Sequence, residues 1–224
     1  MKKENIFTFF LMAVTFVFVT VSGIIFKQSF LRMLPLYVSL VVSVLQSRVN
    51  RYAPLIGGIN SIIYAIVYMF YHLYASAIYA LLVSCPLQII TFVLWNKHPW
   101  QNSTMLKRLN VKARIIIVAG TVASWVTIYY FLSRTNSSHR ELDTAATVLG
   151  IISTILMMLS YYEYTAVMLF GGICSISLYI AMLKDNPEQI TYLCYSVYSQ
   201  ICVIMAFIKV HSIYDRQQKN NMTI

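Results

Sequence analysis

Long apolar runs separated by short polar segments make up most of the chain. A transmembrane helix needs about 20 consecutive, predominantly apolar residues to cross the hydrocarbon core of a bilayer. The second of the runs is the weakest candidate, because Arg32 and Pro35 interrupt it. The pattern nevertheless predicts an all-α integral membrane protein with eight transmembrane helices. The eight runs cover residues 6–26, 30–45, 53–71, 73–95, 115–132, 144–160, 165–183 and 190–210.

The composition agrees with this pattern. Hydrophobic residues make up 59% of the 224 positions and charged residues 11%, whereas a soluble domain has about 45–50% and about 25%. The net charge of +10 would suggest nucleic acid in a soluble protein. Here the basic residues lie at the ends of apolar runs, as in loops that face anionic lipid. We therefore expect a lipid bilayer as the partner, and no nucleic acid.

The distribution of Lys and Arg predicts the orientation in the membrane. The first run is longer than the 7–15 apolar residues of a signal peptide, so it is expected to be an uncleaved span. With eight spans, both termini and the longest polar loop, residues 96–114, share one side. That side carries 12 of the 17 basic residues. The positive-inside rule then places both termini on the cytoplasmic side of a bacterial inner (plasma) membrane.

An internal repeat organises the runs further. Residues 57–62, Gly-Gly-Ile-Asn-Ser-Ile, recur at 171–176 as Gly-Gly-Ile-Cys-Ser-Ile. The same offset of 114 superposes spans two to four on spans six to eight. Equivalent spans then cross in the same direction, which predicts a 3+1+3 core of two parallel repeats, as in SWEET-like sugar permeases, plus an extra N-terminal helix. A chance match of six residues is the alternative.

The repeat also divides the chain into five expected segments. These are an N-terminal helix (1–28), a first three-helix repeat (29–96), a basic cytoplasmic loop with a linking helix (97–142), a second three-helix repeat (143–210) and a cytoplasmic tail (211–224).

Polar side chains inside the spans are the candidates for a binding site, because polar groups in a membrane usually face a bundle interior or a cavity. Amide side chains offer both a donor and an acceptor, and Tyr offers a ring and a hydroxyl. Such a set suits an uncharged, aromatic, hydroxylated solute. Interfacial belts and helix packing are the alternative explanations. The predicted substrate-binding residues are Asn60, Tyr64, Tyr79, Gln88, Tyr195, Tyr198 and Gln200.

Other kinds of chemistry find little support in the sequence. The four cysteines, Cys85, Cys174, Cys194 and Cys202, lie in apolar runs without a C-x-x-C pair, so we expect free thiols and no metal site. No nucleophile–base pair or phosphate-binding glycine loop is present. We therefore expect no cofactor and no enzymatic activity. No buried carboxylate stands out as a proton relay either.

Three stretches resemble the PnuC-type nicotinamide riboside transporters and their vitamin-transporting relatives, over about residues 30–214. The first is Gly57-x-Ile59-Asn60 with residues 73–76, Leu-Tyr-Ala-Ser. The second is residues 85–88, Cys-Pro-Leu-Gln, followed by Trp-Asn-Lys-His at 95–98. The third runs from Asp143-x3-Thr147-x-Leu149 to Glu163.

The resemblance implies a 3+1+3 core, a homotrimer and facilitated diffusion of nicotinamide riboside or a related vitamin, trapped afterwards by phosphorylation. One departure matters. Where the family has Trp-x-x-Trp at the substrate pocket, residues 165–168 read Thr-Ala-Val-Met. Thiamine, riboflavin or a deoxynucleoside therefore stay open as substrates. A SWEET-like sugar permease and a non-transporting membrane subunit are the wider alternatives.

Overall fold

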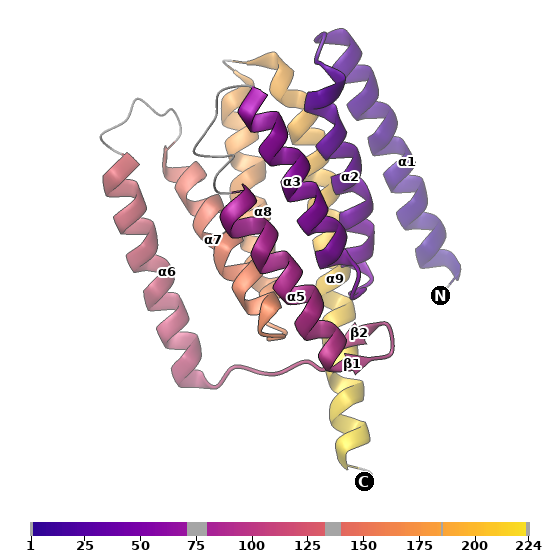
Figure 1. Cartoon of the computed structure of the whole chain (residues 1–224), viewed down its shortest axis with the longest axis vertical. Helices are drawn as coiled ribbons and strands as arrows, with labels where there is room; N and C mark the ends of the chain where they lie inside the picture. The colour runs from indigo at the N-terminus through magenta and orange to yellow at the C-terminus, as the bar shows by residue number, and fades with distance from the viewer. Residues whose placement is uncertain (1, 71–79, 133–139, 185, 223–224) are drawn as a thin grey trace.

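The computed structural model describes residues 2–70, 80–132, 140–184 and 186–222. Within these ranges the chain is almost entirely helical (Figure 1). The long helices are α1 (Lys2–Ile25), α2 (Phe30–Ser47), α3 (Ala53–Phe70), α5 (Cys85–Lys97), α6 (Val111–Leu132), α7 (Arg140–Met158), α8 (Tyr164–Leu183) and α9 (Ile190–Met222). The short elements are a π-helical turn (Ala80–Ser84), strands β1 (Pro99–Trp100) and β2 (Ser103–Thr104), and a 3₁₀ turn (Pro187–Gln189).

These helices correspond to the eight apolar runs. Among the described residues, seven helical segments are long and apolar enough to cross a membrane, and the apolar part of α3, Ala53–Val67, is shorter. The weakest predicted span is a continuous helix, α2. Its N-cap Ser29 accepts a hydrogen bond from the backbone N–H of Arg32, and Pro35 lies in the second turn. The prediction of an all-α membrane protein is therefore confirmed.

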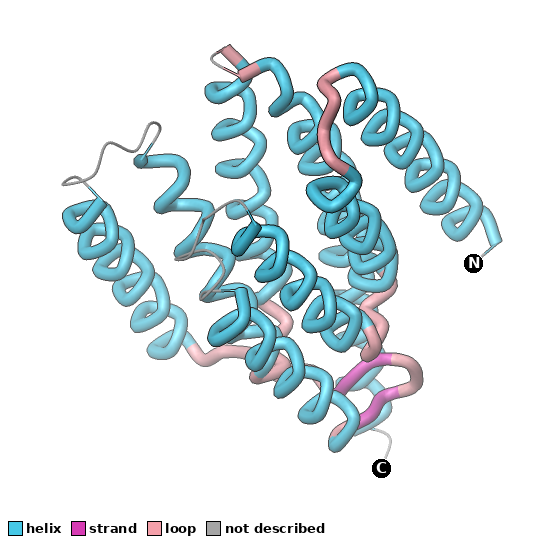
Figure 2. Tube along the Cα trace, turned by 45° about the horizontal axis from the view of Figure 1, so that its top comes forward, coloured by secondary structure: helices cyan, strands magenta, loops and turns pink. Residues whose placement is uncertain are grey.

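Six of the helices pack in a closed ring. Helix α3 lies between α2 and α5, and α8 lies between α7 and α9, while α5 contacts α7 and α9 contacts α2. If α2, α3 and α5 are exchanged in order with α7, α8 and α9, each helix keeps the same kind of neighbours in the ring. The order supports the interpretation as two parallel repeats, which stays a prediction. Helix α1 packs outside the ring on α2 and α9, and α6 stands at the edge against α7 (Figures 1 and 2).

The segment after α5 closes one end of the ring. We expected only a polar loop here, but it contains a β-hairpin (Figure 2). The Gln217 side chain, 1% exposed, accepts from the Leu106 N–H (2.9 Å) and donates to the Thr104 carbonyl (3.0 Å). Leu106 and Trp95 belong to a buried apolar cluster that also contains residues of α7, α8 and α9. The C-terminus and the start of α1 lie toward this same end of the bundle (Figure 1).

Candidate functional site

A polar cavity of about 260 Å³ lies between the three helices of the second half, α7, α8 and α9. Serine and tyrosine hydroxyls, one amide and several small residues form its wall, and within the described part of the chain none of the lining residues is charged. Four of the lining residues are glycine or alanine, and a Cβ at Gly150 would meet nothing within 4 Å. The lining residues are Ala146, Gly150, Ser153, Met168, Gly171, Gly172, Ser175, Tyr179, Tyr195, Ser196, Ser199, Gln200 and Val203.

Gln200 is the amide of this cavity. Its Nε2 donates to the Leu169 carbonyl of α8 at 3.0 Å, which fixes the side chain against α8. Its Oε1 is buried and has no hydrogen-bond partner. Gly172 makes the close approach possible, because a Cβ at that position would overlap Oε1. An unpaired buried acceptor costs roughly 1–3 kcal/mol, so Gln200 is prepared to accept a hydrogen bond from a bound molecule or water.

The two ends of the cavity differ in chemistry. Helix α8 begins beside the basic loop, since the Tyr162 N–H donates to the Lys107 carbonyl at 3.0 Å. Met168 therefore lies toward the loop, and Tyr179 lies eleven residues further along α8, about 16 Å at 1.5 Å per residue. Helix α9 runs the opposite way, which places Tyr195 near Tyr179 and Val203 near Met168. The cavity thus has an aliphatic end near the loop and an aromatic end away from it.

The first half contains a polar cluster that includes the corresponding amide, Gln88. Gln88 Nε2 donates to the hydroxyls of Ser61 (3.0 Å) and Ser84 (3.1 Å), which lie 2.9 Å from each other. Asn60 Nδ2 donates to Ser39 Oγ at 2.7 Å, while Asn60 Oδ1 is buried without a partner. The π-helical turn Ala80–Ser84 directly precedes Pro86 of α5, and π turns recur at functional sites.

The structure places four of the seven residues predicted for the site in two separate groups. Tyr195 and Gln200 line the cavity of the second half, whereas Asn60 and Gln88 belong to the cluster of the first half. Tyr64 is half-buried on α3. Tyr79 lies outside the described residues. The assignment of these seven residues to substrate binding stays a prediction.

Tyr198 and its neighbours show why a three-residue spacing does not define one face. Each step of three turns the side chain by about 300°, so Tyr192 and Tyr198 lie about 120° apart around α9. Tyr195 faces the cavity, but Tyr198 is 2% exposed and its hydroxyl donates to the Leu40 carbonyl of α2 at 3.0 Å. In the structure Tyr198 therefore joins the two halves and does not line the polar cavity.

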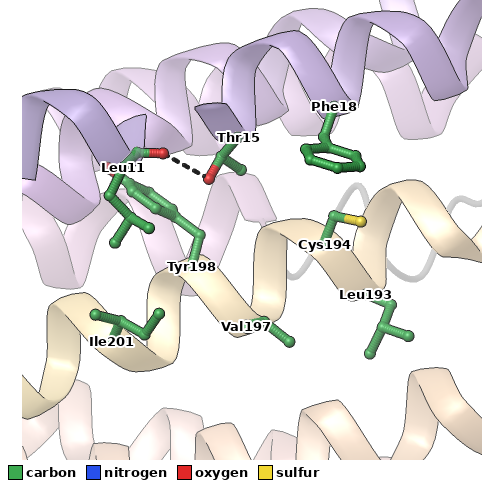
Figure 3. A pocket seen from close by; sticks show the side chains of 8 residues that line it. All are labelled: Leu11, Thr15, Phe18, Leu193, Cys194, Val197, Tyr198 and Ile201. Carbon is green, nitrogen blue, oxygen red and sulfur yellow. Dashed lines mark hydrogen bonds between the residues drawn. The ribbon is translucent and has the colours of Figure 1, made fainter. Parts of the chain in front are cut away.

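A second cavity, of about 310 Å³, lies between α1 and α9 and is mainly apolar (Figure 3). Its hydroxyl groups are already paired. Thr15 Oγ1 donates to the Leu11 carbonyl at 2.8 Å, and Tyr198 donates to Leu40. Without an available polar group, this cavity does not suit a hydroxylated solute.

Sequence reasoning missed the contribution of α7. Ser153 and Gly150 of that helix line the cavity, and the repeat could have indicated Ser153, since the offset of 114 relates it to Ser39, the partner of Asn60. At positions 165–168 only Met168 reaches the cavity. Thr165 is fully buried and bonds the Tyr162 carbonyl, and Val167 packs on the apolar cluster at the loop end.

The membrane-spanning helices, three of which enclose a neutral polar cavity, define the chain as a polytopic integral membrane protein. Comparison with known sequences specifies the class. The family model described as nicotinamide mononucleotide transporter matches residues 29–209, and the chain belongs to this family. Because this is a family of transporters, membership confirms the prediction that the chain is not an enzyme.

Two similar proteins are also transporters by name. A nicotinamide riboside transporter PnuC of Neisseria mucosa is 30% identical over 175 residues, which cover 72% of this chain and 66% of the relative. The crystal structure of the vitamin B3 transporter PnuC superposes with a TM-score of 0.78 at 22% identity, covering 96% of this chain and 93% of that one. The second likeness confirms the fold.

Proposed function

We propose that the protein is a facilitator that carries an unphosphorylated, vitamin-like nucleoside across the cell membrane, with nicotinamide riboside as the first candidate. The relative of 30% identity bears the name of a transporter for that compound. Within this chain, the observation that carries the proposal is the unpaired Oε1 of Gln200 in a cavity walled by hydroxyls. It offers an acceptor to a sugar hydroxyl.

The charge of the cavity distinguishes a nucleoside from a nucleotide. The family model is named after a mononucleotide, but a phosphate group needs Lys, Arg or backbone N–H partners when it leaves water. Among the described residues that line the cavity none is basic. All of them lie in helices, whose interior N–H groups are bonded within the helix. The riboside, which lacks the phosphate, therefore fits this wall better than the mononucleotide.

Coupling and orientation complete the proposal. Among the described residues, no Asp or Glu lines the cavity. That part of the lining offers no carboxylate to carry a proton with the solute, and transport follows the solute gradient. The basic loop, α1's start and the C-terminus face the cytoplasm, as the positive-inside rule predicts. The homotrimer that the resemblance implies is proposed with it.

The test is uptake into proteoliposomes of the purified chain, with nicotinamide riboside, its mononucleotide, thiamine, riboflavin, a deoxynucleoside and a simple sugar. We expect saturable uptake of the riboside that needs no ion gradient, and no uptake of the mononucleotide. Uptake of a sugar alone would support a SWEET-like permease. Impermeable vesicles, together with no ligand-induced rise in melting temperature, would overturn the proposal.

A further inference from the structure

The aromatic end of the polar cavity connects to an ion pair that joins the two halves of the molecule. Tyr179 of α8 lines the cavity and stacks on Tyr192 of α9, with ring centroids 5.9 Å apart and ring planes at 19°. Arg32 of α2 donates from Nε to the Tyr192 hydroxyl at 3.1 Å. Its Nη1 lies 3.1 Å from Glu188 Oε2, just before α9.

These contacts restrain the Tyr179 ring through its stacking neighbour, Tyr192. Arg32 is partly buried, with its side chain 25% exposed and that of Glu188 38% exposed. Gln28 holds the same region by donating to the Glu188 carbonyl (3.2 Å) and to Thr191 Oγ1 (3.3 Å). Arg32 holds the Tyr192 side chain through its hydrogen bond to the hydroxyl and also lies over the ring, 5.5 Å from the centroid. A ring stacked on such a fixed neighbour loses little freedom on binding, and pre-organised side chains bind more tightly for that reason.

The faces of tyrosine rings carry negative electrostatic potential and attract cations, most strongly where water is excluded. Tyr179 and Tyr195 supply two such rings at one end of a cavity whose described lining residues carry no charge. A flat ring that carries a positive charge would gain both stacking and cation–π attraction there. A neutral ring would gain stacking alone.

We propose that Tyr179 and Tyr195 form a subsite for a cationic heteroaromatic ring, and that Arg32, Glu188 and Tyr192 are positioning residues for Tyr179. The inference rests on the proposed function and deepens it by assigning particular residues to the ring of the solute. The pyridinium of nicotinamide riboside and the thiazolium of thiamine meet this requirement. Riboflavin and the common deoxynucleosides are uncharged and do not.

The experiment compares nicotinamide riboside with its 1,4-dihydro form, which has nearly the same shape but neither the charge nor the aromaticity. Dissociation constants for both are measured on the purified full chain. The unchanged protein should prefer the oxidised form, and Tyr179→Leu should reduce this preference by about 5- to 30-fold, equivalent to roughly 1–2 kcal/mol. Tyr179→Phe should retain most of it, because the ring is kept.

The positioning residues are tested by neutralising the ion pair as a unit, Arg32→Gln with Glu188→Gln, so that no single charge is left behind. This variant should reduce the preference by about twofold or more, as expected for residues coupled through contacts. The matched control neutralises the ion pair at the loop end, Arg114→Gln with Glu163→Gln, whose atoms are 2.8 Å apart. It should leave the preference unchanged.

The ratio of the two constants separates recognition from general damage, since a loosened fold weakens both ligands alike. If Tyr179→Leu does not yield folded protein, Tyr195→Leu provides the same measurement at the second ring. An unaltered ratio in the folded Leu variants would overturn this inference alone. Failure of the unchanged protein to bind either form would overturn the proposed function, and the inference with it.

Discussion

The two halves of the molecule share one structural device but use it differently. In each half an amide on the third helix lies against a glycine of the second, so closely that a Cβ at Gly57 or Gly172 would overlap the Oε1 of Gln88 or Gln200. In the first half two serine hydroxyls accept from Gln88. In the second half Gln200 reaches a backbone carbonyl, and its oxygen stays unpaired beside a cavity.

This difference indicates where the capacity to bind a solute comes from when two halves share one structural device. An amide that is bonded by its own neighbours stabilises the bundle, whereas the same amide with an unpaired oxygen beside open space can serve a ligand. The first half is therefore expected to act mainly as the scaffold and the second half as the binding half. The four predictions below test this division.

Matched substitution of the two amides should give the largest effect. Gln200→Leu removes the acceptor from the cavity, and we expect uptake per folded molecule to fall by about tenfold or more, since a lost hydrogen bond to a buried partner costs roughly 1–3 kcal/mol. Gln88→Leu should lower the melting temperature while uptake per folded molecule changes by less. Loss of uptake by well-folded Gln88→Leu would show that both halves bind the solute.

Replacing each of the two glycines, Gly172 and Gly57, by alanine should give the next largest difference in uptake. A Cβ at Gly172 displaces the flexible end of Gln200, so Gly172→Ala should reduce uptake several-fold. It should cost little stability, because alanine in a helix is favoured over glycine by about 0.5–1 kcal/mol. Gly57→Ala should instead disturb the two hydrogen bonds that Gln88 donates to Ser61 and Ser84. The loss of these bonds should offset the stability gained from alanine in the helix, so the melting temperature should not rise. Equal uptake in both variants would contradict the division between the halves.

The fold was largely predictable from the sequence, and particular residues show why. Apolar runs bounded by basic residues specify spans, and even the run broken by Arg32 and Pro35 forms a helix, α2, because Arg32 finds Glu188 and Tyr192 as partners. The hairpin after α5 was not predictable, because a side chain 111 residues away, Gln217, holds the loop behind it.

The site was predictable only in part. Gln200 and Tyr195 were identified because polar groups in a span need partners. Whether such a partner is another side chain or a ligand depends on packing between helices, which is why Gln88 and Gln200 could not be told apart. The three-residue spacing of tyrosines suggested one face for Tyr195 and Tyr198, but the helical twist separates them, and Tyr198 bonds to α2.

Asn60 provides a smaller and more discriminating test, since its Oδ1 is also buried without a partner. Asn60→Leu removes that cost but leaves Ser39 without its donor. These changes oppose each other, so the net loss of stability should be about 1 kcal/mol or less. Uptake per folded molecule should stay within about threefold if the first half is only a scaffold. A larger loss, measured in proteoliposomes, would assign Asn60 to the solute.

The serines at the offset of 114 should give the smallest effects. Ser61 and Ser175 each donate to the carbonyl four residues earlier, Gly57 (3.1 Å) and Gly171 (3.0 Å). Their local bonds are therefore alike, and Ser→Ala at each removes a similar contact within the helix.

What differs between them is the second contact. Ser61 also accepts from Gln88, so Ser61→Ala should lower the melting temperature and leave the Kd unchanged. Ser175 lines the cavity, so Ser175→Ala should weaken solute binding by about two- to fivefold, as for a single neutral hydrogen bond of roughly 0.5–1 kcal/mol. The reverse result, a Kd changed only by Ser61→Ala, would move the binding half to α2, α3 and α5. Because the two serines have the same local geometry, such a reversal could not be attributed to damage within one helix.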